Sequence, residues 1–403
     1  MNPTIKARIE SIRRGEVPEG YKRTKIGIVP NEWVTNVTLK SICTINPKTE
    51  QLPDQFIYID LESVVEGVLV CKKIIEKSNA PSRAQRVLQV NDVIYQMVRP
   101  YQRNNYLFRH KSKSYKYVAS TGYAQLRAKC YAFLYYLINS DYFCVQVLEK
   151  CTGSNYPAIN SEDLASISIT YPKKEAEQEK IAEILAGQDR VIALKEKLLE
   201  EKQKQKKYLM QQLLTGKKRL PGFSGEWKKI FLDKLAQIST GNKNTQDQVM
   251  NGNYPFFIRS DEICRINSYS YDGEAILIPG EGKIGEIFHY IKGKFDYHQR
   301  VYKISDFVCN GKYIFYYLQA FFKKRALSMS AKATVDSLRR EMLTDMEINL
   351  PSQKEQTAIA EILSTADNEI ELLKKDIEQE KLKKKSLMQL LLTGIVRVDE
   401  LVS

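Results

Sequence analysis

The sequence predicts an α+β protein with an internal pseudo-twofold repeat, in which a pair of long antiparallel helices separates two globular domains. Two observations support this prediction. Residues 178–216 align without a gap on residues 356–394, with 20 identities in 39 positions. Each copy has apolar residues at helical spacing, and each follows a region of short strand-like runs. A period of 178 residues is far too long for a solenoid, so it indicates duplication of a whole module.

Residues 1–174 are expected to form the first globular domain. Strand-like runs occupy 56–61, 67–74 and 92–98, with turn residues between them. Residues 131–146 are aromatic-rich and amphipathic, which indicates a helix. We interpret the aromatic stripe of this helix as core packing rather than as a platform for stacked bases.

The first long helix is expected at 175–216. Its apolar residues recur every three or four positions, no proline interrupts it, and Gly216 stands where glycine commonly ends a helix. At 1.5 Å per residue, the 39 repeated positions correspond to roughly 58 Å of helix. A helix of that length is a spacer rather than the core of one small domain.

Residues 217–351 are expected to form the second globular domain. Its strand-like runs lie at 254–258, 275–278 and 287–291, and 313–327 is an aromatic-rich helix. The second long helix follows at 352–395, and residues 396–403 form a C-terminal tail.

The order of these parts favours an antiparallel helix pair. The short connection between Gly216 and Trp227 leaves little room for another return of the chain. Pseudo-twofold symmetry then brings Met1 and Ser403 together, as in a ring that is cut open near its termini.

The charge distribution favours a polyanionic partner for the two domains. The chain carries 62 Lys and Arg against 48 Asp and Glu, a formal net charge of +14. Residues 1–174 contribute +10 and residues 217–351 contribute +6, whereas the long helices are close to neutral. We therefore expect a phosphate backbone to bind the domains and not the helices.

Polar loops after the strands supply candidate DNA contacts. Arginine suits the O6 and N7 atoms of guanine, and Asn or Gln suits the N6 and N7 atoms of adenine. An ordinary polar loop remains the alternative interpretation. The candidates are Arg99, Tyr101, Gln102, Arg103, Asn104, Asn105, Ser154 and Asn155 in the first domain, and Arg259, Ser260, Gly282, Lys283, Arg300, Lys332 and Thr334 in the second.

Gly280, Gly282 and Gly285 form a G-x-G-x-x-G pattern after a strand-like run. A dinucleotide site needs a helix that opens at the third glycine. Residues 286–291 alternate like a strand instead, so we expect a glycine-rich hairpin tip.

No catalytic or metal-binding constellation is recognisable. The sequence lacks GxxxxGK[ST], HExxH, GxSxG and the Asn-Pro-Pro-aromatic run of amino-methyltransferases, and its seven cysteines include no CxxC pair. We expect no chemistry and no metal site in this chain. The N-terminus has no apolar signal region and no apolar run is long enough to span a membrane, so a reducing cytoplasm is the expected location.

The duplicated pattern resembles the specificity subunit of type I restriction-modification systems. Each basic domain enters its helix through Glu-Gln-x-x-Ile-Ala and leaves through Leu-Met-Gln-x-Leu-Leu-Thr-Gly, around a Gly-Phe-Ser-Gly-Glu-Trp junction at 222–227. The resemblance covers nearly the whole chain. It implies that residues 1–174 and 217–351 are target recognition domains, each of which reads one half of a split, asymmetric DNA sequence.

The resemblance also implies partners for the helices. Two methyltransferase subunits would dock there, bind S-adenosylmethionine and methylate adenine, and restriction subunits would use ATP and Mg²⁺ for translocation and cleavage. The apolar helix positions expected at the contact are Ile181, Leu185, Leu209, Leu213, Ile359, Leu363, Leu387 and Leu391. The alternative is a coiled-coil scaffold with two partner-binding domains and no sequence-specific DNA recognition.

Overall fold

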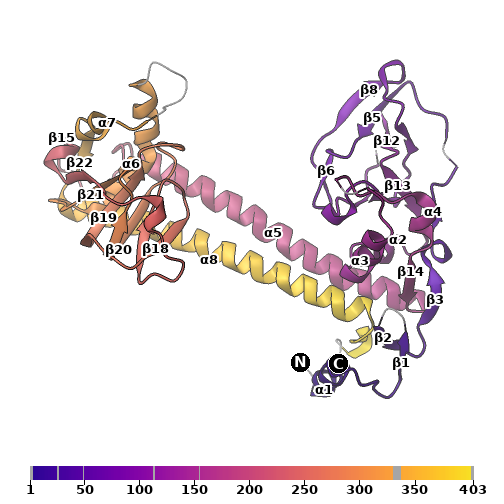
Figure 1. Cartoon of the computed structure of the whole chain (residues 1–403). Helices are drawn as coiled ribbons and strands as arrows, with labels where there is room; N and C mark the ends of the chain where they lie inside the picture. The colour runs from indigo at the N-terminus through magenta and orange to yellow at the C-terminus, as the bar shows by residue number, and fades with distance from the viewer. Residues whose placement is uncertain are drawn as a thin grey trace. The chain divides into compact units, whose positions relative to one another are not determined.

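The computed structural model describes residues 3–24, 27–48, 50–111, 114–153, 155–329 and 337–400. The chain divides into two compact units. Unit 1 comprises Met1–Leu194 and Ile377–Ser403, and unit 2 comprises Lys195–Asp376. Each unit contains an α+β domain and a part of both long helices (Figure 1).

The long helices α5 (Glu175–Leu213) and α8 (Gln353–Leu392) lie where the sequence predicts them. In unit 2, the residue numbers of the paired side chains rise along α5 as they fall along α8, which confirms the antiparallel pairing. The ion pairs across the helices are Lys384–Asp189 in unit 1 and Lys195–Asp376, Lys202–Glu369 and Lys206–Asp367 in unit 2. The helices are therefore shared between the compact units and do not form regions of their own.

Unit 1 contains two four-stranded sheets, ordered β11-β10-β13-β4 and β8-β5-β12-β9, and the pairs β1-β2, β6-β7 and β3-β14. Its shorter helices are α1 (Pro3–Arg13), α2 (Tyr131–Ile138), α3 (Asp141–Glu149) and α4 (Ser161–Ala165). Its strands are β1 (Tyr21–Thr24), β2 (Gly27–Pro30), β3 (Val34–Thr38), β4 (Thr44–Ile45), β5 (Gln55–Ile59), β6 (Val64–Val65), β7 (Val68–Leu69), β8 (Lys73–Glu76), β9 (Ala84–Val87), β10 (Val93–Gln96), β11 (Tyr106–Leu107), β12 (Lys116–Ser120), β13 (Tyr123–Arg127) and β14 (Ser168–Tyr171).

Unit 2 contains one six-stranded sheet, ordered β16-β21-β19-β20-β17-β18, and the pair β15-β22. Its shorter helices are α6 (Gly311–Ser328) and α7 (Arg340–Thr344). Its strands are β15 (Lys228–Phe231), β16 (Gln237–Thr240), β17 (Tyr254–Phe257), β18 (Ile263–Ile266), β19 (Tyr271–Pro279), β20 (His289–Tyr297), β21 (Val301–Ser305) and β22 (Glu347–Leu350).

The two units share part of their strand topology. The parallel pair β5-β12 of unit 1 corresponds to β17-β20 of unit 2, and β4-β13-β10 corresponds to β16-β21-β19. The backbone N–H of Met97 donates to the Gly122 carbonyl, and that of Gly280 donates to the Arg300 carbonyl, at equivalent places after β10 and β19. The repeat that is visible in the helices therefore extends to the domains, where sequence identity has been lost.

The aromatic helices pack into the cores, as the sequence predicts. Tyr136 and Tyr316 lie at equivalent positions and are 5% and 1% exposed. Each hydroxyl donates a 2.8 Å hydrogen bond to a long-helix aspartate, Tyr136 to Asp189 and Tyr316 to Asp367. Both aspartates also pair with a lysine of the opposite long helix. This double contact explains why the aspartate recurs in both copies of the repeat.

Some elements differ from the prediction. The helix expected at 131–146 is two helices, because Ser140 caps a new helix by accepting a hydrogen bond from the backbone N–H of Phe143. The strand expected at 67–74 is split between β7 and β8. Residues 280–288 form the connection of the antiparallel pair β19-β20, which confirms a hairpin tip instead of a dinucleotide site.

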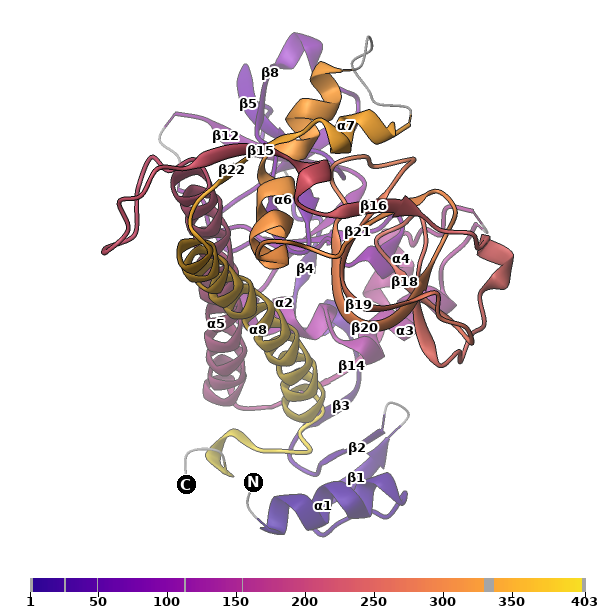
Figure 2. The ribbon, with the colours of Figure 1, turned by 90° about the vertical axis from the view of Figure 1, so that its left-hand side faces the viewer.

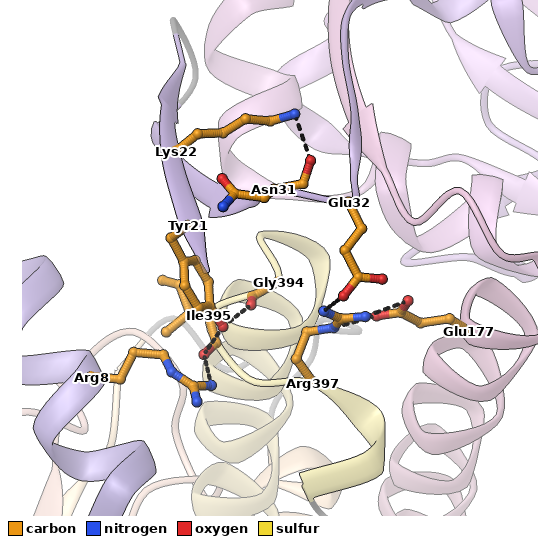
Figure 3. Close-up of polar contacts among 9 residues, drawn as sticks. All are labelled: Arg8, Tyr21, Lys22, Asn31, Glu32, Glu177, Gly394, Ile395 and Arg397. Carbon is orange, nitrogen blue, oxygen red and sulfur yellow. Dashed lines mark hydrogen bonds and ion pairs between the residues drawn. The ribbon is translucent and has the colours of Figure 1, made fainter. Parts of the chain in front are cut away.

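Described residues near the two ends of the chain meet in unit 1, where α1 and the β1-β2 hairpin lie beside the end of α8 (Figures 1 and 2). Arg8 Nη1 donates to the Ile395 carbonyl at 3.2 Å, and the Tyr21 hydroxyl donates to the Gly394 carbonyl at 3.0 Å (Figure 3). Met1 and Ser403, which the sequence analysis expects to be neighbours, lie outside the described residues.

An ion pair also stabilises this contact between the two end regions of the chain, and it has a counterpart in unit 2. Arg397 donates to both oxygens of Glu177, at 2.7 and 2.9 Å, and to Glu32 at 3.1 Å (Figure 3). Arg219 makes the same two-pronged contact with Glu355, at 2.7 Å for both bonds. Both arginines come three residues after the glycine that ends a repeat. The contact between the two end regions of the chain in unit 1 therefore repeats the contact that the continuous chain makes after Gly216 in unit 2.

Candidate nucleic-acid interface

Four strand ends converge at one place in unit 2. The turn 298–300 between β20 and β21 lies against the end of β16, because Gln299 N–H donates to the Lys243 carbonyl. It also lies against the ends of β17 and β19, because His298 N–H donates to the Phe257 carbonyl and the Arg300 carbonyl accepts from Gly280. A side chain at Gly280 would come within 2.9 Å of the Arg300 carbonyl oxygen, so the close approach favours glycine there.

Charged side chains meet at these strand ends. Arg259 Nη1 lies 3.0 Å from Glu281 Oε2, and Arg300 Nε lies 3.5 Å from Glu281 Oε1. The side chains of Arg259, Glu281 and Arg300 are 50%, 34% and 63% exposed. They line an open groove of about 350 Å³ together with Asn244, Thr245, Gln246, His298 and Gln299. We refer to this set of residues as the arginine groove.

His298 supports the arginine groove from within. It is 4% exposed, and its Nδ1 accepts a hydrogen bond from the Arg300 backbone N–H at 2.9 Å. Burial lowers its pKa below the usual 6.5, and the positive charge of Arg259 lowers it further. The imidazole is therefore neutral at pH 7, which is the form that can accept this hydrogen bond.

The other candidates of the second domain have separate positions. Gly282 and Lys283 are exposed on the β19-β20 connection, and Ser260 follows Arg259 and bonds the Glu262 carbonyl at 3.4 Å. Lys332 and Thr334 lie outside the described residues. The structure thus brings Arg259 and Arg300 together, and it adds Glu281, which the sequence analysis did not select.

In the first domain, the loop 99–105 turns back on its own unit. Arg103 donates to the Asn139 carbonyl and to Asp141 Oδ1, at 3.1 and 2.7 Å. Asn105 is 1% exposed, accepts from Gln96 N–H at 2.8 Å, and donates to Asn139 Oδ1 at 3.1 Å. The prediction that Asn105 contacts DNA is therefore wrong, because its side-chain amide is buried and hydrogen-bonded to internal partners.

Gln102 and Asn104 also have internal partners. Gln102 Oε1 accepts from Gln96 Nε2 at 2.9 Å, and Asn104 Oδ1 accepts from the Glu66 backbone N–H at 3.1 Å. The second bond attaches the loop to the tip of the β6-β7 hairpin. At Gly67 on that tip, an added Cβ would lie 2.5 Å from the Tyr135 hydroxyl, so the tip is held close to α2.

Three of the remaining candidates of this domain, Arg99, Tyr101 and Asn155, lie at its surface. The Arg99 guanidinium lies 4.4 Å from the centre of the Tyr156 ring, and Arg99 N–H donates to the Pro157 carbonyl. Tyr101 is 50% exposed and Asn155 is exposed, whereas Ser154 lies outside the described residues. The structure therefore joins the two loops that the sequence analysis selected, 99–105 and 152–156.

Sequence reasoning missed the β6-β7 hairpin as a surface feature. Val65, Val68, Val70 and Ile74 are 47–60% exposed on this hairpin and on the chain that follows it. An alternating valine run around a central Glu-Gly pair is the sequence signal that marks such a hairpin. Asn104 fixes its tip, so the loop 99–105 supports this surface as well as contributing to it.

The predicted partner-binding positions require a correction. Ile181, Leu185, Leu213, Ile359, Leu363 and Leu391 are 0–3% exposed and belong to the hydrophobic cores of the units, and Leu209 and Leu387 pack against those cores. The apolar stripe of an amphipathic helix is buried against a neighbouring surface, and for α5 and α8 that surface is the chain's own domains. In this structure, these eight positions are therefore covered by the chain's own domains, and the exposed surface of α5 and α8 lies on their other residues.

A larger groove of about 1010 Å³ lies in unit 1. Its walls include Lys384, Lys385 and Met388 of α8 and Tyr142 and Val145 of α3. Val145 is 55% exposed, and Lys385 Nζ lies 3.5 Å from Asp141 at the start of α3. The groove combines apolar surface with charged side chains of both signs, among them Glu66, Asp141 and Glu149.

The described part of the chain has neither a metal-binding cluster nor a membrane-spanning helix. No group of three or more His, Cys, Asp and Glu side chains there could hold a metal ion. None of the helices in that part combines the length and apolarity that crossing a membrane requires.

The sequence matches the family model described as type I restriction modification DNA specificity domain, over residues 30–203 and 224–381. The type I restriction enzyme EcoDI specificity subunit of Escherichia coli is 33% identical over 154 residues, which cover 38% of this chain and only 34% of that protein. The putative type I restriction enzyme MjaX specificity subunit of Methanocaldococcus jannaschii is 24% identical over 427 residues, covering 94% of this chain and 97% of that protein.

Solved structures share the fold. A chain from a study of complex assembly and conformational transition in the type I restriction-modification system has a TM-score of 0.61 at 22% identity, covering 91% of this chain and 99% of that chain. The specificity subunit of a type I system from M. genitalium has a TM-score of 0.59 at 15% identity, covering 89% and 96%.

Proposed function

Because the chain belongs to the type I restriction-modification DNA specificity family, we propose that it selects the DNA sequence on which a methyltransferase and restriction complex acts. Each unit reads one half of a bipartite, asymmetric target. The alternative of a scaffold without sequence-specific DNA recognition is not favoured by the family match or by the named relatives.

The arginine groove is the single observation that carries this proposal. It lies in a domain with a net charge of +6 and presents arginine, asparagine and glutamine side chains together. These side chains make bidentate contacts with base edges in the major groove of DNA, and arginine also neutralises phosphates. Unit 1, whose domain carries +10, offers the Arg99–Tyr156 surface for the same purpose.

Methyltransferase subunits dock on the outward faces of α5 and α8. The groove between α3 and α8 in unit 1 supports this assignment, because it offers apolar surface and charged side chains of both signs to another protein chain. The near-neutral charge of the long helices also suits a protein rather than DNA. We propose two methyltransferase subunits, matched to the two repeats, with the restriction subunits joining through them.

The chemistry belongs to those partners. S-adenosylmethionine binds the methyltransferase subunits, and ATP and Mg²⁺ bind the restriction subunits. This chain contributes binding energy and sequence selection, and it is a non-catalytic subunit of a cytoplasmic complex.

The proposal is tested by expressing the chain with and without a type I methyltransferase subunit from the same genome, followed by sequencing of N6-methyladenine across the host DNA. We expect one bipartite sequence to be methylated only when both proteins are present. Methylation by the purified chain alone, or methylation that does not depend on this chain, would contradict the proposal.

A further inference from the structure

Glu281 is an acidic side chain at a surface that is expected to bind a polyanion. An uncompensated carboxylate there would repel phosphates, so its position between two arginines needs an explanation. We propose that Glu281 is a positioning residue that aims Arg259 and Arg300 at guanine bases in the half-site read by unit 2. This inference rests on the proposed function, since it names the base that the arginine groove takes.

The backbone at Glu281 and at the residue before it is held by hydrogen bonds. Gly280 N–H donates to the Arg300 carbonyl at 2.7 Å, and the Gly280 carbonyl accepts from Leu338 N–H at 2.8 Å. Glu281 itself forms an isolated β-bridge with Ser337. The carboxylate therefore stands at a defined place, and it can orient the longer and more flexible arginine side chains.

The carboxylate uses one oxygen for each arginine. Oε2 contacts Arg259 through Nη1, and Oε1 contacts Arg300 through Nε. Each guanidinium therefore uses one of its nitrogens in its contact with Glu281. A guanidinium carries five N–H donors, and a bidentate contact to guanine O6 and N7 uses only two. Each arginine keeps enough donors for a base, and their mutual repulsion is reduced by the charge between them.

The equivalent positions of unit 1 lack these charges. The hydrogen bond from Met97 N–H to the Gly122 carbonyl matches that from Gly280 N–H to the Arg300 carbonyl. Gly122 is therefore at the position equivalent to Arg300, and Val98 is at the position equivalent to Glu281. The strand pairing of Ile59 with Ala119 matches that of Phe257 with Tyr297, so Leu61 is at the position equivalent to Arg259. Among the described residues, this Arg–Glu–Arg set therefore occurs in unit 2 and not at the equivalent positions of unit 1, so the guanine preference belongs to one half-site.

The test uses the complex with its methyltransferase subunits and duplex DNA that carries the methylated sequence found by sequencing. The half-site of unit 2 is identified by exchanging residues 217–351 for those of a relative. Each guanine of that half-site is then replaced singly by 7-deazaguanine, which removes only the N7 acceptor. We expect the unmodified complex to lose affinity about 5- to 100-fold at one or two of these guanines.

Glu281→Gln should bind the unmodified target but should discriminate much less against 7-deazaguanine, with an unchanged first half-site. Glu286→Gln is the matched control, because it removes one charge from the same loop, where Glu286 pairs with Lys323 on the surface. Arg300→Lys is a second variant that keeps the charge and loses the bidentate contact, and it should lose discrimination at one guanine.

Some outcomes would overturn the inference alone. They are a half-site without guanine, full 7-deazaguanine discrimination in Glu281→Gln, or equal loss of affinity for modified and unmodified DNA. If the complex methylates no defined sequence, the proposed function fails first, so the two failures can be told apart.

Discussion

Replacing Arg397 by methionine should destabilise unit 1 and leave unit 2 largely unchanged. Glu177 is 9% exposed, and Arg397, with 19% of its side chain exposed, donates to both of its oxygens. Burial alone would lower the pKa of Arg397, but the hydrogen bonds and charges of Glu177 and Glu32 outweigh it and raise the pKa. The arginine is therefore charged at any pH at which the protein is folded, and methionine leaves the buried carboxylate of Glu177 without this partner.

The expected loss follows from this burial. Breaking a fully buried ion pair costs about 3–5 kcal/mol, and the partial exposure of Arg397 reduces this to about 2–3 kcal/mol in the free energy of unfolding of unit 1. The contact with Glu32 adds little, because that carboxylate is 59% exposed. For a unit of this size, the melting temperature should fall by about 4–12 °C.

The assay is urea unfolding combined with amide hydrogen exchange, which separates unit 1 from unit 2. Arg14→Met is the control, because Arg14 pairs with Glu16 in water and its loss should have no measurable effect. Adding Glu177→Gln to Arg397→Met should restore part of the stability, since a neutral amide is easier to bury. Wild-type unfolding of the Arg397→Met variant, or faster exchange confined to unit 2, would refute this reasoning.

Asn105→Ala should lower the stability of unit 1 by about 1–3 kcal/mol, because a buried backbone N–H loses its acceptor, whereas Tyr101→Ala should leave stability unchanged in thermal unfolding. Asp141 has a pKa below its usual 3.8, because the hydrogen bond and charge of its arginine partner outweigh the effect of burial. The stability that this pair adds is therefore complete above pH 3.8 and is lost as the pH falls further, so Asp141→Asn and the wild type should converge in acid unfolding but differ at pH 7. One heptad inserted after both Lys202 and Glu369, which form an ion pair across the helices, should lengthen the spacer of the methylated sequence by about three base pairs and keep both half-sites. An unchanged spacer would show that the helices do not set it.

The long helices could be predicted from the sequence because their signals are local. Apolar spacing, a terminal glycine and a duplicated segment fix a helix without knowledge of its neighbours. Strand pairing depends on contacts between distant residues, so the short strands β3 and β14, and the pair β15 and β22, were not predicted. The recurring aspartate at 189 and 367 was visible, but its tyrosine partners were not.

The site was predictable only in part, for a related reason. Composition located the polar loops, yet it could not tell an asparagine that faces solvent from one that binds its own backbone, which is how Asn105 was misassigned. The apolar stripe of the helices gave the same ambiguity between a partner and the chain's own core. Glu281 was missed because an acidic residue in a loop carries no sign of the two arginines that the fold brings to it.

The most direct test of two independent recognition units is the exchange of residues 217–351 for the corresponding region of a relative with a different target. Sequencing of N6-methyladenine in cells that contain the hybrid and its methyltransferase gives the new target. We predict that one half-site changes to that of the relative, while the other half-site and the spacer are retained. A hybrid that folds and methylates but changes both half-sites, or neither, would contradict the account.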